Sequence, residues 1–176
     1  IKIGNHTFVI EAEETLKERQ EQAKSEATGS EPPWMLDLHE LCNMLPPRDV
    51  GVEDPVEMID GRGRTSAALA GDADGPRACR LLLLAASKSR ATDIHSEPKG
   101  DSVQVRMRVD GQMVGAVNLP NGVGELVNGL IKTACQMRPT GREAVLDGHF
   151  SVKFGASEVN QARRVDYRVS FTPSIH

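Results

Sequence analysis

Charged and titratable side chains alternate in the stretch 93–111, and their spacing suggests chemistry. Three ionisable residues, Asp93, His95 and Glu97, stand at alternate positions. An extended backbone turns alternate side chains to the same face, so we expect all three to point one way. They could form a metal or acid–base site, but no second histidine stands at metal-ligand spacing. The pattern therefore favours a structural role, in which Asp93 and His95 bond to backbone or to neighbouring strands.

Two arginines follow in a segment with a regular pattern. Apolar and polar residues alternate from 102 to 109, which predicts a half-buried strand with Arg106 and Arg108 on its exposed face. Two guanidinium groups held on a strand suit a phosphate or carboxylate partner. The alternative is a solvated strand face on which each arginine pairs with an Asp or Glu. Asp110-Gly111 then predicts a tight hairpin turn, because glycine accepts the positive φ that the turn needs.

The elements that must position these residues are predicted from hydrophobic periodicity in the second half of the chain. Asp74 is expected to cap a first helix and Asn121 a second one, which Pro139 stops. The expected order is a helix at 74–89, strands at 102–109 and 112–119, a helix from 121, and strands at 148–154 and 164–171. Helix, two strands, helix, two strands predicts an α+β fold, in which helices pack on an antiparallel sheet.

Two glycines in the second helix have the spacing of a phosphate-binding loop. Gly124 and Gly129 are separated as in that motif, but Lys132 comes two residues too late and the helical period runs through the segment. We therefore interpret this segment as a helix and not as a nucleotide loop.

The first 74 residues are predicted to form an extension to this domain. The segments are expected to be a short hairpin at 1–10, a solvated helix or flexible arm at 11–27, a partly helical segment at 34–45 and a linker at 48–74. Composition thus divides the chain into an N-terminal extension, 1–74, and a domain, 75–176.

Composition limits the classes of function. Of the 176 residues, 39% are hydrophobic and only 3% aromatic, which predicts a modest aliphatic core. The net charge of −4 gives no overall attraction to nucleic acid, and no apolar run approaches the roughly 20 residues of a membrane span. We therefore expect no nucleic-acid partner and no membrane span. Cys42, Cys79 and Cys135 show neither disulfide nor metal spacing, which favours a reducing cytoplasm.

An ordered set of motifs runs from residue 91 to the end of the chain. The motifs are Ala-Thr-Asp-Ile-His-Ser-Glu-Pro at 91–98, Val-Arg-Met-Arg-Val-Asp-Gly at 105–111, Ile-Lys at 131–132, Asp-Gly at 147–148, Val-Asp-Tyr-Arg-Val-Ser at 165–170 and Thr-Pro-Ser-Ile-His at 172–176. This set resembles the secretion-system ATPases of the GspE/PulE/PilB family, the cytoplasmic motors of type II secretion and type IV pilus assembly. The resemblance covers about residues 75–176, whereas 1–74 resemble no family that we can name.

The resemblance implies a fold and a role. In that family this region is a PAS-like domain that precedes the RecA-like motor domain, so the ATP-binding loop is expected beyond His176. The resemblance implies a hexamer that uses ATP and Mg²⁺, while this piece itself is not catalytic. It implies that Arg106 approaches the nucleotide phosphates and that Arg108 does so too or holds the domain interface. The implied partners are the motor domain of the same or a neighbouring subunit and an inner-membrane platform protein, at the cytoplasmic side of the inner membrane.

The sequence also departs from the family pattern. The family's Ser-Arg-Ile-Lys has Leu130 in place of its arginine, and the family's Asp-Gly-Arg has His149 in place of its arginine. A second hypothesis is therefore a non-enzymatic docking module of a degenerate ATPase, which binds a platform component through residues 1–45. A third, a small-molecule sensor, is disfavoured because the chain has few aromatic residues and no convergent polar groups.

Overall fold

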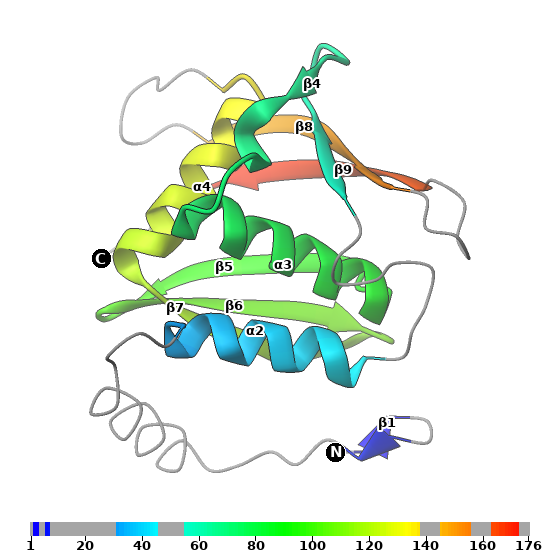
Figure 1. Ribbon diagram of the computed structural model, residues 1–176, viewed down its shortest axis with the longest axis vertical. Helices are drawn as coiled ribbons and strands as arrows, with labels where there is room; N and C mark the ends of the chain where they lie inside the picture. The colour runs from blue at the N-terminus through cyan, green and yellow to red at the C-terminus, as the bar shows by residue number, and fades with distance from the viewer. Residues whose placement is uncertain are drawn as a thin grey trace.

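The computed structural model describes residues 2–3, 6–7, 31–45, 55–137, 145–155 and 163–172 (Figure 1). The helices are α2 (Pro33–Met44), α3 (Asp74–Ser89) and α4 (Asn121–Ala134), with a short 3-10 helix, η1 (Ala67–Leu69). The strands are β1 (Lys2–Ile3), β2 (His6–Thr7), β3 (Val56–Ile59), β4 (Thr65–Ser66), β5 (Asp93–Lys99), β6 (Ser102–Val109), β7 (Gln112–Pro120), β8 (Leu146–Phe154) and β9 (Arg163–Phe171).

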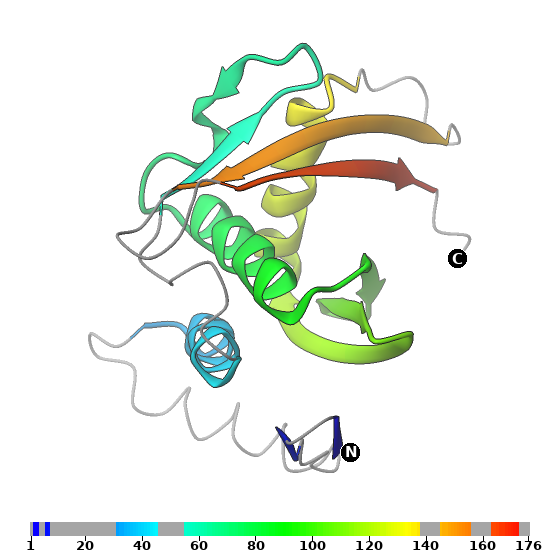
Figure 2. The ribbon, with the colours of Figure 1, turned by 90° about the vertical axis from the view of Figure 1, so that its right-hand side faces the viewer.

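Two antiparallel sheets carry the fold, and β1 and β2 form a separate small pair. One sheet has the strand order β5-β6-β7 and the other β4-β3-β8-β9. Figure 2 shows α3 between the two sheets, with the four-stranded sheet above it and the three-stranded sheet below. The predicted α+β class is therefore confirmed, while the PAS-like topology stays a prediction.

The central helix α3 supplies much of the hydrophobic core. From Ala78 to Lys88 nearly every residue of α3 is buried, because α2, α4 and η1 all pack against it. The buried side chains of the sheets meet it from both sides, among them Val105 of β6 and Val152 of β8, each at most 2% exposed. One aliphatic core thus unites the two sheets.

The prediction of a linker at 48–74 is wrong for residues 56–69, because this segment contains β3, β4 and η1. Strand β3 pairs with β8, and its Met58 lies opposite Val152 with no exposed surface. A four-residue strand is too short to show a clear alternation among glycine, aspartate and proline. The division of the chain at residue 75 stays a prediction, although contacts of β3 and α2 cross it.

Helix α2 is tied to α3 by a buried charge. The ammonium group of Lys88, whose residue is only 6% exposed, donates to the carbonyl oxygen of Cys42 in the last turn of α2. That carbonyl is one of the groups that a helix end leaves without an intrahelical partner. The same turn places the Cys42 thiol 3.6 Å from the Leu81 carbonyl oxygen. The predicted helix at 34–45 is therefore a packed part of the fold.

Both predicted helix caps are wrong in detail. Helix α4 begins at Asn121 after Pro120, and the Asn121 side chain instead donates to the Gly100 carbonyl oxygen at 3.3 Å. Asp74 lies in the first turn of α3, after Ala73, and makes no capping hydrogen bond. Neither Ala73 nor Pro120 carries a side-chain acceptor, so the first turns of α3 and α4 receive no capping hydrogen bond from the residue that precedes each helix. The arm at 11–27 and Pro139 lie outside the described residues.

The β3–β4 turn is held by one carboxylate. Asp60 accepts hydrogen bonds from the backbone N–H groups of Arg62 and Arg64, each at 2.9 Å, and from the Arg64 guanidinium. It also accepts one from the side-chain amide of Gln136, at 2.9 Å, just after α4. These bonds, led by that from the Arg64 backbone, lower the pKa of Asp60 to about 2. The turn is thereby fastened to the end of α4.

We expect Asp60 to make the stability of the protein depend on acid pH. Its pKa in the folded state lies below the ordinary value of 3.8, so its contribution is complete above that value and is lost as the pH falls towards 2. Asp60→Asn, which cannot titrate, should lower the free energy of unfolding at neutral pH. Urea unfolding between pH 7 and pH 2 should show the two proteins converging at the acid end. A gap that stays constant over this range would contradict the assignment.

Candidate functional site

The ribbon formed by β5 and β6 positions the residues predicted to do chemistry. Antiparallel pairing sets Asp93 opposite Arg108 and His95 opposite Arg106, so these side chains share one face. The opposite face of β6 is buried, with Val103, Val105 and Met107 each at most 3% exposed. The predicted half-buried strand is confirmed, and its polar face turns away from the core.

Each arginine of the ribbon has an acidic partner within this chain. One terminal nitrogen of Arg106 lies 2.8 Å from both carboxylate oxygens of Glu97, and Nε of Arg108 lies 3.1 Å from Asp93. The arginine side chains remain 35% and 40% exposed. The structure thus has the ion pairs that the sequence left open as an alternative to an anion partner. The Nε of Arg106 is buried and has no partner among the described residues.

The turn at the end of β6 adds to this arrangement. Asp110 and Gly111 have φ values of 49° and 79°, as a turn with two left-handed residues requires. A terminal nitrogen of Arg108 donates to the Gly111 carbonyl oxygen at 3.3 Å. Arg108 is therefore held at two points, whereas Arg106 is held by Glu97 alone within the described part of the chain.

The geometry around His95 does not form a metal centre. Across the described residues, no group of three or more histidine, cysteine, aspartate or glutamate side chains could hold a metal ion. His95 lies beside Arg106 with no hydrogen bond to another described residue, whereas Asp93 also accepts one from the Thr92 hydroxyl at 2.8 Å.

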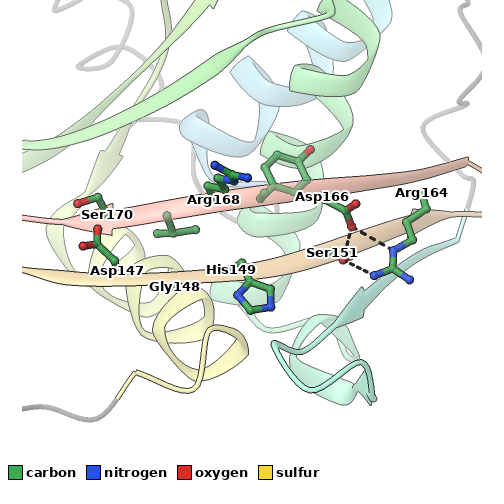
Figure 3. A pocket seen from close by; sticks show the side chains of 10 residues that line it. Asp147, Gly148, His149, Ser151, Arg164, Asp166, Arg168 and Ser170 are labelled. Atoms are coloured by element: carbon green, nitrogen blue, oxygen red, sulfur yellow. Dashed lines mark hydrogen bonds and ion pairs between the residues drawn. The ribbon is translucent and has the colours of Figure 1, made fainter.

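A second polar surface, not predicted as a site, lies on the outer face of β8 and β9 (Figure 3). Polar residues alternate along both strands and line an open concavity of about 810 Å³. At one end, the Ser151 hydroxyl donates to Asp166, and Arg164 donates to both at 3.1 and 2.9 Å. The bond from Ser151, followed by that from Arg164, lowers the pKa of Asp166. The polar side chains at this end therefore already bind one another by hydrogen bonds.

The middle of the same surface is open. His149 lies directly opposite Arg168, and neither side chain has a hydrogen bond or ion pair within the described ranges. The signal in the sequence was the alternation of polar residues in two paired strands, which marks a solvated face and does not by itself indicate a ligand.

Curated relatives share extended similarity with this chain. PilB, the type IV pilus assembly ATPase of Myxococcus xanthus, is 30% identical over 109 residues, 62% of this chain. The type II secretion system protein E of Xanthomonas campestris pv. campestris is 32% identical over 108 residues, 61% of this chain. The chain is thus similar to members of the GspE/PilB family over 49–80% of its length. No family model matches it.

Only part of each GspE/PilB relative is represented here. The chain spans 18% of the length of both the Myxococcus and the Xanthomonas proteins. Type II secretion system protein E of Klebsiella pneumoniae is 28% identical over 141 residues, 80% of this chain and 24% of that protein. Because that alignment is longer than the segment 75–176, the similarity to the GspE/PilB family extends ahead of residue 75.

The departures from the GspE/PilB pattern lie on the surface. Leu130 is half-buried on α4 beside Leu126, which is 55% exposed, and both line a second open concavity of about 390 Å³. His149 lies on the outer face of β8. Among the described residues, no helix is long and apolar enough to span a membrane.

Proposed function

We propose that this chain is a regulatory and adaptor region of a type II secretion or type IV pilus assembly ATPase. In this proposal Arg106 approaches the phosphates of ATP at a subunit or domain interface. The region also transmits conformational changes between neighbouring domains or subunits. The observation that carries the proposal is the position of Arg106, whose side chain is 35% exposed on a paired ribbon with a single carboxylate partner among the described residues.

The Glu97 partner is compatible with this role because it is exchangeable. Its side chain is 53% exposed, and ion pairs at such sites contribute only about 0–1 kcal/mol. A triphosphate carries more charge than one carboxylate and offers oxygens that fit the same planar guanidinium. Glu97 then occupies the place of the phosphate until nucleotide arrives. Arg108, with its second bond to the turn, is better suited to hold the interface.

The remaining parts of the proposal concern the longer protein. A RecA-like motor domain of the same or a neighbouring subunit supplies the ATP and Mg²⁺ site in a hexamer, and an inner-membrane platform protein is the partner on the cytoplasmic side. The names of the relatives, a pilus assembly ATPase and a secretion protein, support this setting.

Freeing Arg106 should strengthen nucleotide binding by the full-length protein. Glu97→Gln removes the competing charge, so we expect its affinity for ATP to rise by up to about fivefold, the equivalent of one surface ion pair. Fluorescent ATP titration measures this change. Asp166→Asn is the matched control, because it frees Arg164 on the other sheet and should leave the affinity unchanged. Equal affinities for all three proteins would argue against a phosphate site at Arg106.

A non-enzymatic docking module is the second candidate. It is favoured by Leu130 and His149, which replace two family arginines, and by the ion pairs that both ribbon arginines already make. Sequencing the gene past His176 distinguishes the two candidates. A Gly-x4-Gly-Lys-Ser/Thr motif within roughly the next hundred residues supports the motor, because that loop binds the phosphates. Its absence supports the docking module.

A further inference from the structure

Strand β5 forms an open edge of the three-stranded sheet. In the described part of the chain its one strand neighbour is β6. Ser96 and Pro98 are exposed, and so is Ile94, at 36%. An edge of this length presents backbone N–H and C=O groups that can pair with a further strand, and proteins commonly protect such edges with charges and proline. The kind of strand that this edge accepts is therefore set by its side chains.

The charges of β5 are arranged symmetrically about Ser96. If β5 is paired antiparallel with itself about this residue, Asp93 lies opposite Lys99 and His95 lies opposite Glu97, all on one face. On the other face Ile94 lies opposite Pro98. We infer that β5 pairs in this register with β5 of a second copy of this chain, which joins the two three-stranded sheets into one. This inference does not depend on the proposed nucleotide role.

The ribbon continues the same alternation of charge across the pair. Arg108 of β6 lies opposite Asp93, and Asp93 would face Lys99 of the second copy. A positive, a negative and a positive side chain then follow one another across the sheet, so each neighbour is attractive. A strand that sets an acid opposite Asp93 or a base opposite Lys99 meets repulsion at this edge. The charges that protect β5 from unrelated strands are complementary to its own copy.

Helix α4 carries the same symmetry on the opposite face of the ribbon. The Ser96 hydroxyl lies 3.5 Å from Oδ1 of Asn128, which places this flank of α4 beside the centre of β5. Glu125 precedes Asn128 by three residues and Lys132 follows it by four, so the three share one side of the helix. The two-fold axis through Ser96 directs Glu125 towards Lys132 of the second copy. Within the described ranges Glu125 has no ion pair, whereas the Lys132 ammonium group lies 4.6 Å from the centroid of the Phe171 ring and would have to exchange this contact for the pair with Glu125.

Proline at position 98 is compatible with this pairing. In a strand, proline is confined to positions where its nitrogen faces away from the existing ladder. Pro98 therefore faces the open edge, and Ile94 and Ser96 face it too, because alternate residues share a direction. Ser96 can exchange hydrogen bonds with its own copy, and the Ile94 N–H can donate to the Pro98 carbonyl oxygen. The proline removes one donor and leaves the centre of the pair intact.

Light scattering coupled to size-exclusion chromatography tests the association with the 176-residue chain. With increasing concentration the mass should rise from that of one 19.1 kDa chain to that of two. Lys99→Glu sets a second acid opposite Asp93 and should hold the mass at one chain. Circular dichroism should show unchanged secondary structure, because position 99 is exposed.

A cysteine at the centre of the pair tests the register. Ser96→Cys should form a disulfide-linked dimer under mild oxidation, because position 96 lies opposite itself. Ser102→Cys, at the end of the same ribbon, and the unchanged protein are matched controls and should stay unlinked. A single-chain mass at every concentration, or a dimer in which the Ser96→Cys protein remains unlinked, would overturn the inference.

Discussion

Replacing Arg106 by alanine in the full-length protein is expected to lower the rate of ATP hydrolysis at least tenfold. An arginine that neutralises charge on the transferring phosphoryl group contributes about 10³–10⁵ to kcat in well-studied cases, and a partial contact contributes less. The loss should fall on kcat more than on KM, because such a contact strengthens in the transition state. Steady-state hydrolysis measured over a range of ATP concentrations separates the two constants.

Two comparisons make the Arg106 result specific. Arg164→Ala removes another exposed arginine that pairs with an acid of its own chain, and its rate should stay near that of the unchanged protein. Arg106→Lys keeps the charge but loses the planar fork, so it should recover part of the rate. Thermal unfolding of each variant checks the fold. If the Arg106→Ala protein hydrolyses ATP at the normal rate, Arg106 has no role in hydrolysis and its ion pair with Glu97 is only structural.

Gly124→Ala is expected to destabilise the protein by about 1–3 kcal/mol, the usual cost of overpacking a core. Helix α4 approaches β6 so closely that a Cβ at position 124 would lie 2.4 Å from Cγ2 and 2.6 Å from Cβ of Val103. Cβ of Val103 is fixed to its strand, so the helix itself must move. Urea unfolding of the variant and the unchanged protein gives the difference in free energy of unfolding.

The same helix provides the control. A Cβ added at position 129 would have no atom within 4 Å. Gly129→Ala should therefore stabilise the protein by roughly 0.5–1 kcal/mol, because alanine is the better helix former. Adding Val103→Ala to Gly124→Ala removes the two Cγ atoms and should recover part of the loss, with a non-additive free energy. If Gly124→Ala were as stable as Gly129→Ala, the close approach of α4 to β6 would be refuted.

Periodicity predicted the long elements because burial selects their residues. Helix α4 and strands β6 and β9 each present one apolar face, and that face could be identified without the structure. Helix α3 could be identified from its length and its run of leucine and alanine, although it is buried on nearly all sides. The segment 121–134 was correctly separated from a phosphate-binding loop on the same grounds. Strand β3 was missed because four residues are too few to establish a period. The predicted caps, Asp74 and Asn121, are each the first residue of their helix, and the residues before them are Ala73 and Pro120. Neither of these is a residue that helix-capping preferences would select from the sequence.

The site was predictable as a face but not as a set of contacts. Alternation predicted that Asp93 and Glu97 point to one side of an extended segment, and, separately, that Arg106 lies on the exposed face of the next strand. The pairing of β5 with β6 brings these two faces together, which the sequence did not predict. Which acid meets which arginine depends on the register between β5 and β6, because Arg106 reaches diagonally to Glu97 and not to the residue opposite it. Periodicity carries no information on register. The open face with His149 and Arg168 was missed for the same reason, since it depends on how β8 and β9 align.

The buried bond from Lys88 to α2 limits which part of this region could be transferred to another protein as a folded unit. The family motifs begin at residue 91, yet β8 needs β3 as its neighbour and Lys88 needs a carbonyl group from α2. A gene fusion that transferred only the recognisable motifs would leave a charge buried without an acceptor and a strand without its pair. The smallest module that can be inherited as a working piece therefore begins no later than Pro33.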